Sequence, residues 1–231
     1  TFRHKMYADY KGTRKPMPEE LREQVPLMKE VLAAMGVPIL TMAGYEADDI
    51  LGTIAKRCQA EGEEVSVVSG DRDLLQLADT HIKIRIPKTS RGTTEIHDYY
   101  PEDVKREYQV TPTEFIDVKA LMGDTSDNIP GVPSIGEKTA TNLIVAYGSI
   151  ENAYAHLDEV KPPRAKKALE EHYDLAVMSK ELAEICITCP IPFEYEEAKL
   201  ENLYTPEAYQ YMKRLEFKSI LARFDVQDMG G

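Results

Sequence analysis

The fold of this chain is decided by residues 65–77, which read VSVVSGDRDLLQL. The β-branched run at 65–69 predicts a short strand, and the leucines at 74, 75 and 77 predict a short helix. The sequence Gly-Asp-Arg-Asp lies between them. Because ligands bind at the carboxyl ends of strands in open α/β sheets, Asp71 and Asp73 become candidate site residues.

The same pattern extends in both directions along the chain. Upstream, we expect a helix from Pro18 to Met35 with a kink at Pro26, a strand over 38–42, and a helix from Glu46 to about Ala60. Downstream, alternating isoleucines predict a strand over 82–86 that pairs with 93–96. The remainder reads as helices over 101–108, 112–122, 137–147, 149–157, 163–185 and 206–222. An α/β layer followed by appended helices is the predicted fold class.

Composition limits the protein class. The chain has 231 residues, of which 42% are hydrophobic and 29% charged, which is typical of a globular protein and not of a disordered chain. No apolar run approaches the ~20 residues that a membrane helix needs. Three cysteines cannot all pair within one chain, which favours a reducing, cytosolic setting.

The net charge of −12 argues against a nucleic-acid partner, but its distribution does not. Each of the stretches 1–18, 80–94 and 161–167 carries a net charge of +4. The sequence therefore allows a bipolar protein in which basic patches meet a polyanion. Ordinary solvated charge explains any single patch equally well.

Acidic residues gather at three turn positions and point to a metal centre. Like charges repel, so grouping them is costly unless a cation offsets the repulsion. Mg²⁺ prefers such oxygen ligands, and two ions can promote hydrolysis of a phosphodiester. The candidate ligands are Glu46, Asp48, Asp49, Asp71, Asp73, Asp124 and Asp127. Helix capping is the alternative for any one of them.

The segment 131–140, GVPSIGEKTA, resembles a phosphate-binding P-loop, but Glu137 interrupts the motif and no strand precedes it. We interpret it instead as a glycine-rich hairpin between two helices, whose backbone approaches a phosphate. A plain helix–helix turn is the alternative. The basic residues Lys11 and Arg14 lie near Tyr7 and Tyr10, a composition typical of single-strand binding, or of a disordered basic terminus.

Four stretches together resemble the flap endonuclease superfamily, in particular the 5′-nuclease (5′-3′ exonuclease) domain of bacterial DNA polymerase I. They are FRH with YKGTR at 2–4 and 10–14, GYEADD at 44–49, GDRDLLQL at 70–77, and GDTSDNIPGV at 123–132. The resemblance covers nearly the whole chain in the family's order. It implies a Rossmann-like (PIN/flap-nuclease-like) central sheet with helices on both faces, plus a C-terminal helical subdomain that contains a helix-hairpin-helix element.

The resemblance also implies domains and roles. Residues 1–100 would form the nuclease core with a basic arch segment, 101–225 the helical DNA-binding subdomain, and 226–231 a linker. Lys11 and Arg14 would be catalytic, and the seven acids would bind two Mg²⁺ or Mn²⁺ ions. DNA would be contacted by Arg3, Tyr7, Tyr10, Lys11, Arg14, Gly131, Val132, Ser134, Ile135, Gly136, Lys138 and Thr139. The hairpin would also hold K⁺.

One departure from the family concerns the start of the chain. The family begins with a strand carrying an Asp-Gly motif and a second strand carrying another metal-binding aspartate, and both are expected before Thr1. The resemblance thus implies a cytoplasmic, nucleoid-associated bacterial nuclease that cleaves 5′-flaps or 5′-ended duplexes and is covalently linked to polymerase domains. A structure-selective DNA-binding fragment with impaired catalysis is the alternative, and a single-strand ribonuclease is a third.

Overall fold

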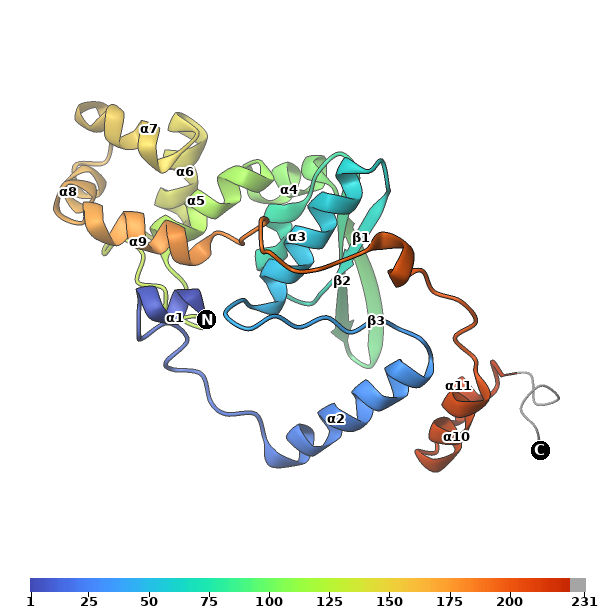
Figure 1. Ribbon diagram of the computed structural model, residues 1–231. Helices are drawn as coiled ribbons and strands as arrows, with labels where there is room; N and C mark the ends of the chain where they lie inside the picture. The colour runs from blue at the N-terminus through green and yellow to red at the C-terminus, as the bar shows by residue number, and fades with distance from the viewer. Residues whose placement is uncertain (225–231) are drawn as a thin grey trace. The chain divides into compact units, whose positions relative to one another are not determined.

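The computed structural model describes residues 1–224 and separates the chain into two units (Figure 1). Unit 1 contains Thr1–Arg14 and Met42–Pro190, and unit 2 contains Lys15–Thr41 and the chain from Ile191 onward. The proposed linker at 226–231 lies outside the described residues. The division into parts 1–100 and 101–225 stays a prediction.

The sheet of unit 1 has three strands in the order β1-β2-β3, namely β1 (Val65–Val68), β2 (Ile82–Ser90) and β3 (Thr93–Tyr99). Strands β1 and β2 are parallel, with Val65 opposite Ile82, and β2 and β3 form an antiparallel hairpin that ends with Ser90 opposite Thr93. The alternation along β2 buries Ile82, Ile84 and Ile86 on one face. This is the half-exposed strand that the sequence predicts.

Helical elements flank the sheet in chain order. Helix α1 (Phe2–Met6) and helix α3 (Ala47–Ala60) precede β1, the 3₁₀ helix η1 (Arg72–Leu77) joins β1 to β2, and α4 (Pro101–Tyr108) follows β3. The leucines of η1 pack with the isoleucines of β2 and with Val104 of α4 in one core. The C-terminal end of β1 therefore leads directly into the acidic turn at Asp71 and Asp73.

The rest of unit 1 is helical, as predicted. It consists of α5 (Pro112–Met122), α6 (Glu137–Tyr147), α7 (Ile150–Ala155), the 3₁₀ helix η2 (Leu157–Glu159), α8 (Pro163–Glu171) and α9 (Tyr173–Ala183). A second core joins α5 to α9 and includes Leu121, Ile144 and Leu169. The expected single helix over 163–185 is wrong in its length, because His172 leaves helical geometry and divides it.

Unit 2 is a small helical assembly. It contains α2 (Glu19–Ala34), the 3₁₀ helix η3 (Tyr195–Ala198), α10 (Pro206–Arg214) and α11 (Lys218–Leu221). Val31, Ala208 and Phe224 belong to its core. The helix expected over 206–222 is interrupted, since Glu216 adopts a φ of +58° between α10 and α11.

Residues 38–42 do not form the strand that the sequence predicts. These residues have no regular structure, and Ile39 and Leu40 are exposed. Among residues 1–224, no helix combines the length and apolarity needed to cross a bilayer. The predicted α/β class with a helical second part is confirmed, with a described sheet of only three strands.

Candidate metal centre

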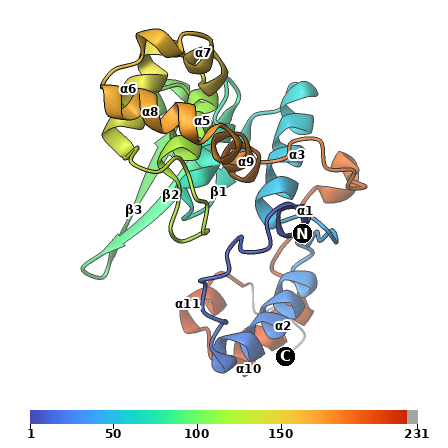
Figure 2. The same ribbon diagram turned by 90° about the vertical axis from the view of Figure 1, so that its left-hand side faces the viewer.

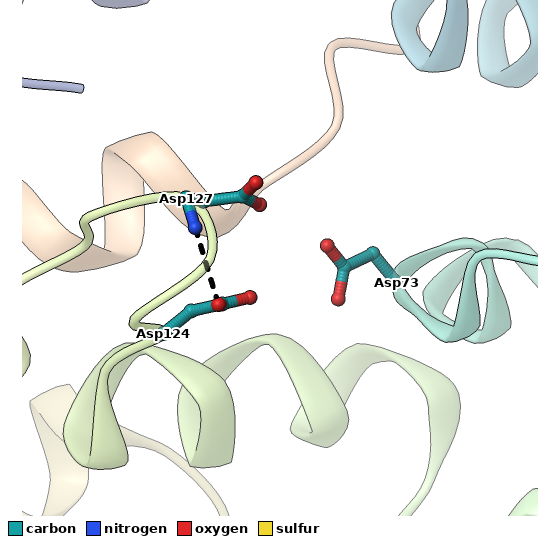
Figure 3. Close-up of side chains that lie close together, drawn as sticks. All are labelled: Asp73, Asp124 and Asp127. Atoms are coloured by element: carbon teal, nitrogen blue, oxygen red, sulfur yellow. Dashed lines mark hydrogen bonds between the residues drawn. The ribbon is translucent and has the colours of Figure 1, made fainter. Parts of the chain in front are cut away.

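Asp73, Asp124 and Asp127 form an acidic cluster in unit 1. One carboxylate oxygen from each lies within 4.8 Å of those of the other two, although the residues come from η1 and from the loop after α5. Figure 3 shows the Asp73 side chain facing those of Asp124 and Asp127. Hard oxygen ligands at this spacing suit a divalent cation such as Mg²⁺ or Mn²⁺.

Two glycines shape the loop that carries Asp124 and Asp127. Gly123 ends α5 with a φ of +77°, and Gly131 has a φ of +66°. A Cβ atom on Gly131 would lie 2.5 Å from the Gly123 nitrogen, so the two backbones can approach only without side chains. Paired backbone hydrogen bonds between Asp124 and Ile129 then close the loop. The loop geometry is therefore built into the sequence.

Local hydrogen bonds orient the Asp124 carboxylate. Its Oδ1 accepts from the Ser126 backbone N–H and from the Ser126 hydroxyl, both at 2.8 Å. Burial acts to raise the pKa of Asp124, but hydrogen bonds from Lys119 and Ser126 outweigh it and lower the pKa to about 2. Asp124 is therefore ionised and ready to bind a cation at neutral pH.

Asp73 and Asp127 of the acidic cluster also line a pocket in unit 1, which we call the acidic pocket. Three further acids contribute to its wall, namely Glu46, Asp48 and Asp71. Glu46 precedes α3 and Asp48 lies in the first helical turn, where a carboxylate interacts favourably with the helix dipole. Asp71 follows β1 and also caps η1, because its side chain accepts from the Asp73 backbone N–H at 2.9 Å. Capping and proximity to the pocket thus coexist at Asp71.

Repulsion between these acids shifts the pKa of Asp48. Burial and the charges of Asp71 and Asp73 raise its pKa to about 6, although Lys11 acts in the opposite direction. In the metal-free folded protein Asp48 therefore keeps its proton to a higher pH than an aspartate of the unfolded chain does. A bound divalent cation would favour the charged form instead.

We predict that Asp48→Asn stabilises the metal-free protein at neutral pH. The folded state binds more protons than the unfolded state between pH 4 and 6, so stability falls as pH rises through this window. Asparagine removes that loss, which we place at about 1 kcal/mol after discounting for partial exposure. Urea unfolding in EDTA should show the gain at pH 7.5 and a much smaller one at pH 4.5. Equal gains at both pH values, or a similar gain for the exposed Asp9→Asn, would contradict this account.

Asp49 differs from the other acids of its motif. It is fully buried, and Arg3 binds both of its carboxylate oxygens at 2.8 Å. The same oxygens also accept from the backbone N–H groups of Glu46 and Cys186, each at 2.9 Å. All four lone-pair positions of Asp49 are thereby used by hydrogen bonds within the protein, and the metal role expected for Asp49 stays a prediction.

Arg3 and Tyr10, for which DNA contacts are predicted, are both buried in the free protein. Arg3 is 2% exposed and also donates to Glu46 and to the backbone carbonyls of Leu182 and Glu184. Tyr10 is 4% exposed, and its hydroxyl donates to Glu46 at 3.2 Å. Tyr7 packs against the helical core. Arg3 and Tyr10 therefore pack beneath the acids of the candidate site.

Lys11 and Arg14 are more exposed than Arg3, and the catalytic role expected for them stays a prediction. The Lys11 ammonium contacts Glu46, and the Arg14 guanidinium contacts Asp127. Lys11 adopts a φ of +56°, and its backbone N–H donates to the Asp127 carbonyl at 2.7 Å, which fixes the turn beside the acidic cluster. Both cations lie next to candidate metal ligands.

Sequence reasoning missed Lys119. Its side chain is 8% exposed on α5, and its ammonium contacts Asp73, lies 2.7 Å from Asp124, and lies 4.0 Å from Asp127. Burial acts to lower the pKa of Lys119, but Asp73 and Asp124 outweigh it and raise the pKa. A signal was present, because Lys119 stands between Val118 and Ala120 in a stretch of buried helix.

The predicted hairpin at 131–139 is formed, but its residues divide into two groups. Gly131, Val132 and Ile135 are buried and shape the turn, and the Gly131 N–H donates to the Ser179 hydroxyl at 3.0 Å. Ser134, Gly136 and Lys138 are exposed at the start of α6, and Thr139 is partly exposed. The residues of the second group are therefore accessible to a ligand.

Comparisons with known proteins identify the family of the chain. The family described as "5'-3' exonuclease, N-terminal resolvase-like domain" matches residues 1–109, and "5'-3' exonuclease, C-terminal SAM fold" matches residues 110–205. DNA polymerase I of Bacillus caldotenax is 44% identical over 225 residues, which are 97% of this chain and 25% of that protein. DNA polymerase I of Bacillus subtilis is 44% identical over 223 residues, with 96% and 25% covered.

Solved structures show the same fold at lower identity. T5 5′-exonuclease with bound zinc has a TM-score of 0.67 and 24% identity, over 94% of this chain and 79% of that one. The catalytic core of Rad2 in complex with DNA substrate has a TM-score of 0.61 and 15% identity, over 94% and 73%. The chain spans about a quarter of the length of the curated relatives it matches.

Proposed function

This chain belongs to the 5′-3′ exonuclease family of DNA polymerase I and the flap nucleases, and we propose that it carries the metal-dependent 5′-nuclease activity of a longer polymerase. The proposed reaction is hydrolysis of phosphodiester bonds in branched or 5′-ended DNA. The proposed cofactor is Mg²⁺ or Mn²⁺, with two ions in the intact domain.

The observation that carries the proposal is the convergence of five acids in one pocket. Glu46, Asp48, Asp71, Asp73 and Asp127 come from three separate segments of the chain, and Asp124 joins them through the acidic cluster. A buried ammonium among three of these carboxylates indicates that the pocket accommodates positive charge. Capping explains individual acids but not their convergence.

The residues of the pocket have distinct proposed roles. A divalent cation bound there supplies Lewis acidity and neutralises phosphate charge. Asp73, Asp124 and Asp127 would hold the cation. Lys11 and Arg14, which contact carboxylates in the free protein, are placed to exchange these partners for phosphate oxygens and stabilise developing negative charge.

Duplex recognition is assigned to the hairpin at 131–139. The exposed backbone at Ser134 and Gly136, with the Lys138 side chain, offers phosphate contacts that do not depend on base sequence. A K⁺ ion at this hairpin belongs to the same proposal. A substrate with a free 5′ end, such as a flap, would reach the acidic pocket from a duplex held here.

The proposal extends to the whole polypeptide. We place the nuclease core at 1–100 and the helical DNA-binding part at 101–225, covalently linked to polymerase domains in a bacterial cytoplasm at the nucleoid. The long relatives, of which this chain matches about a quarter, support this setting.

A second candidate is a structure-selective DNA-binding module without chemistry. It is favoured by the internal ion pairs that occupy Glu46 and the Asp73 cluster in the free protein. Under this alternative, the acids stabilise the fold and never bind a metal ion. Binding of DNA would then be the entire function.

Two assays separate these functions. The full-length gene product is incubated with a labelled 5′-flap in Mg²⁺ and in EDTA, and duplex binding is measured in EDTA. We expect cleavage only with Mg²⁺, and less cleavage of RNA of the same shape. Binding without cleavage in either Mg²⁺ or Mn²⁺ would support the module, and preferential RNA cleavage would refute the DNA assignment.

A further inference from the structure

A second hairpin in unit 1 repeats the pattern of the hairpin at 131–139. The apolar residues of the first are Val132, Ile135, Ala140, Leu143 and Ile144. The residues found 25 positions further along are Leu157, Val160, Ala165, Ala168 and Leu169. Both sets belong to the same hydrophobic core. The matching spacing indicates that the two hairpins place their apolar residues in the core in the same pattern.

The structure gives both hairpins similar surroundings. The first leads into α6 at Glu137, and the second leads from η2 into α8 at Pro163. Figures 1 and 2 both place α6, α7 and α8 in one group at the end of the helical part. The repeated spacing therefore places each turn directly before a helix that packs in the same core.

Cations replace small residues at the exposed positions of the second hairpin. Lys161 stands where the first hairpin has Gly136, and Arg164 stands where it has Thr139. Both are exposed, and neither forms an ion pair with another residue of the described range 1–224. They remain available for an anion from outside the chain.

The neighbouring lysines add to this charge. Lys166 lies 3.8 Å from Asp158, and Lys167 lies 3.8 Å from Glu171. The Asp158, Lys167 and Glu171 side chains are largely exposed, so these pairs contribute little stability and neutralise the patch weakly. Four cations within seven residues on a protein of net charge −12 are an unusual local concentration.

We propose that residues 157–167 form a second backbone-binding hairpin, in which Lys161 and Arg164 contact phosphates of duplex DNA. The inference rests on the proposed function, because it adds a second grip on the same class of ligand. Arg164 can bind a phosphate through two N–H groups, and Lys161 acts as a mobile point charge. Neither contact reads base sequence.

The test uses Lys161→Ala/Arg164→Ala in the full-length gene product. Affinity for a blunt DNA duplex is measured in EDTA over a series of salt concentrations. We expect about tenfold weaker binding and a salt slope that is smaller by about 2, since each phosphate contact contributes ~0.9 to that slope. The matched control, Lys105→Ala/Arg106→Ala, removes the same charge from exposed positions on α4 and should change affinity less than about twofold.

The outcomes separate this inference from the proposed function. If the wild-type protein binds duplex and cleaves flaps but the double variant binds equally well, the second hairpin is wrong and the nuclease assignment stands. Equal losses in the variant and the control would show a general effect of net charge and would also overturn the inference. If the wild-type protein neither binds duplex nor cleaves flaps, both proposals fail. Circular dichroism and thermal unfolding verify that each variant is folded.

Discussion

Asp124→Asn is expected to reduce cleavage of a 5′-flap in Mg²⁺ at least ~10³-fold, equivalent to about 4 kcal/mol of lost transition-state stabilisation. Asparagine retains the side-chain oxygen that accepts from Ser126, so the loop should keep its shape. What is lost is the negative charge next to Asp73 and Asp127. A hard divalent cation binds an amide oxygen more weakly than a carboxylate, and catalysis depends on the position of that cation.

Binding and cleavage must be measured separately for this variant. Single-turnover cleavage in Mg²⁺ gives the catalytic loss, and duplex affinity in EDTA should stay within about threefold of wild type. Asp103→Asn is the matched control. Like Asp124, Asp103 accepts a hydrogen bond from a backbone N–H, in this case that of Tyr100 at 2.9 Å. Asp103 does not line the acidic pocket, so the control should cleave normally. Wild-type turnover by Asp124→Asn would refute the metal centre.

Local patterns predicted most of the secondary structure because they report local physics. The helices at 101–108, 112–122 and 137–147 have the bounds expected from their sequence. The Thr111 hydroxyl accepts from the Glu114 N–H, a cap that the sequence itself encodes. The failures lie where tertiary partners decide: segment 38–42 has apolar residues suited to a strand but pairs with no strand in the described chain.

The sequence pointed to the acids of the candidate site and to Lys11 and Arg14, but not to Lys119 or to the burial of Arg3. Asp71 and Asp73 follow the carboxyl end of β1, the edge of an open α/β sheet at which ligands bind, and this position could be predicted from the sequence. The environment of Arg3 could not be predicted, since its partners lie 43 to 181 residues away and its sequence neighbours suggest an exposed basic tail. The distinction between Asp48 and Asp49 also depends on which face of α3 is buried, which a pair of adjacent acids does not reveal.

Lys119→Met is expected to raise the affinity for Mn²⁺ by at least about tenfold. The ammonium of Lys119 contacts Asp73 and lies 2.7 Å from Asp124, in the space that the carboxylate ligands of a cation would enclose. Oxygen ligands lie within ~2.6 Å of a divalent ion, so the ammonium and the ion cannot share that position. At ~4 Å and an effective dielectric constant of about 20, two unit charges interact by about 4 kcal/mol. A tenfold change in affinity corresponds to only about 1.4 kcal/mol, so removing the repulsion between Lys119 and the ion is sufficient for the expected gain.

The same substitution should destabilise the metal-free protein. Methionine leaves three carboxylates without their common cation, and breaking a buried ion pair costs about 3–5 kcal/mol. Thermal unfolding in EDTA should therefore show a lower midpoint than wild type, and added Mn²⁺ should recover more stability in the variant than in wild type. Isothermal titration with Mn²⁺ in the absence of DNA measures the affinity directly and does not depend on activity.

Lys180→Met separates competition at the metal centre from a general loss of packing. Lys180 is a partly buried lysine held by Asp117 and Glu151, each at 2.8 Å, and it contacts none of the candidate metal ligands. This control should also lower stability, while its Mn²⁺ affinity should equal that of wild type. If Lys119→Met instead weakens Mn²⁺ binding, Lys119 positions the carboxylates for the metal ion. In that case the ammonium stabilises the metal site instead of competing with the metal ion, and the competition model is wrong.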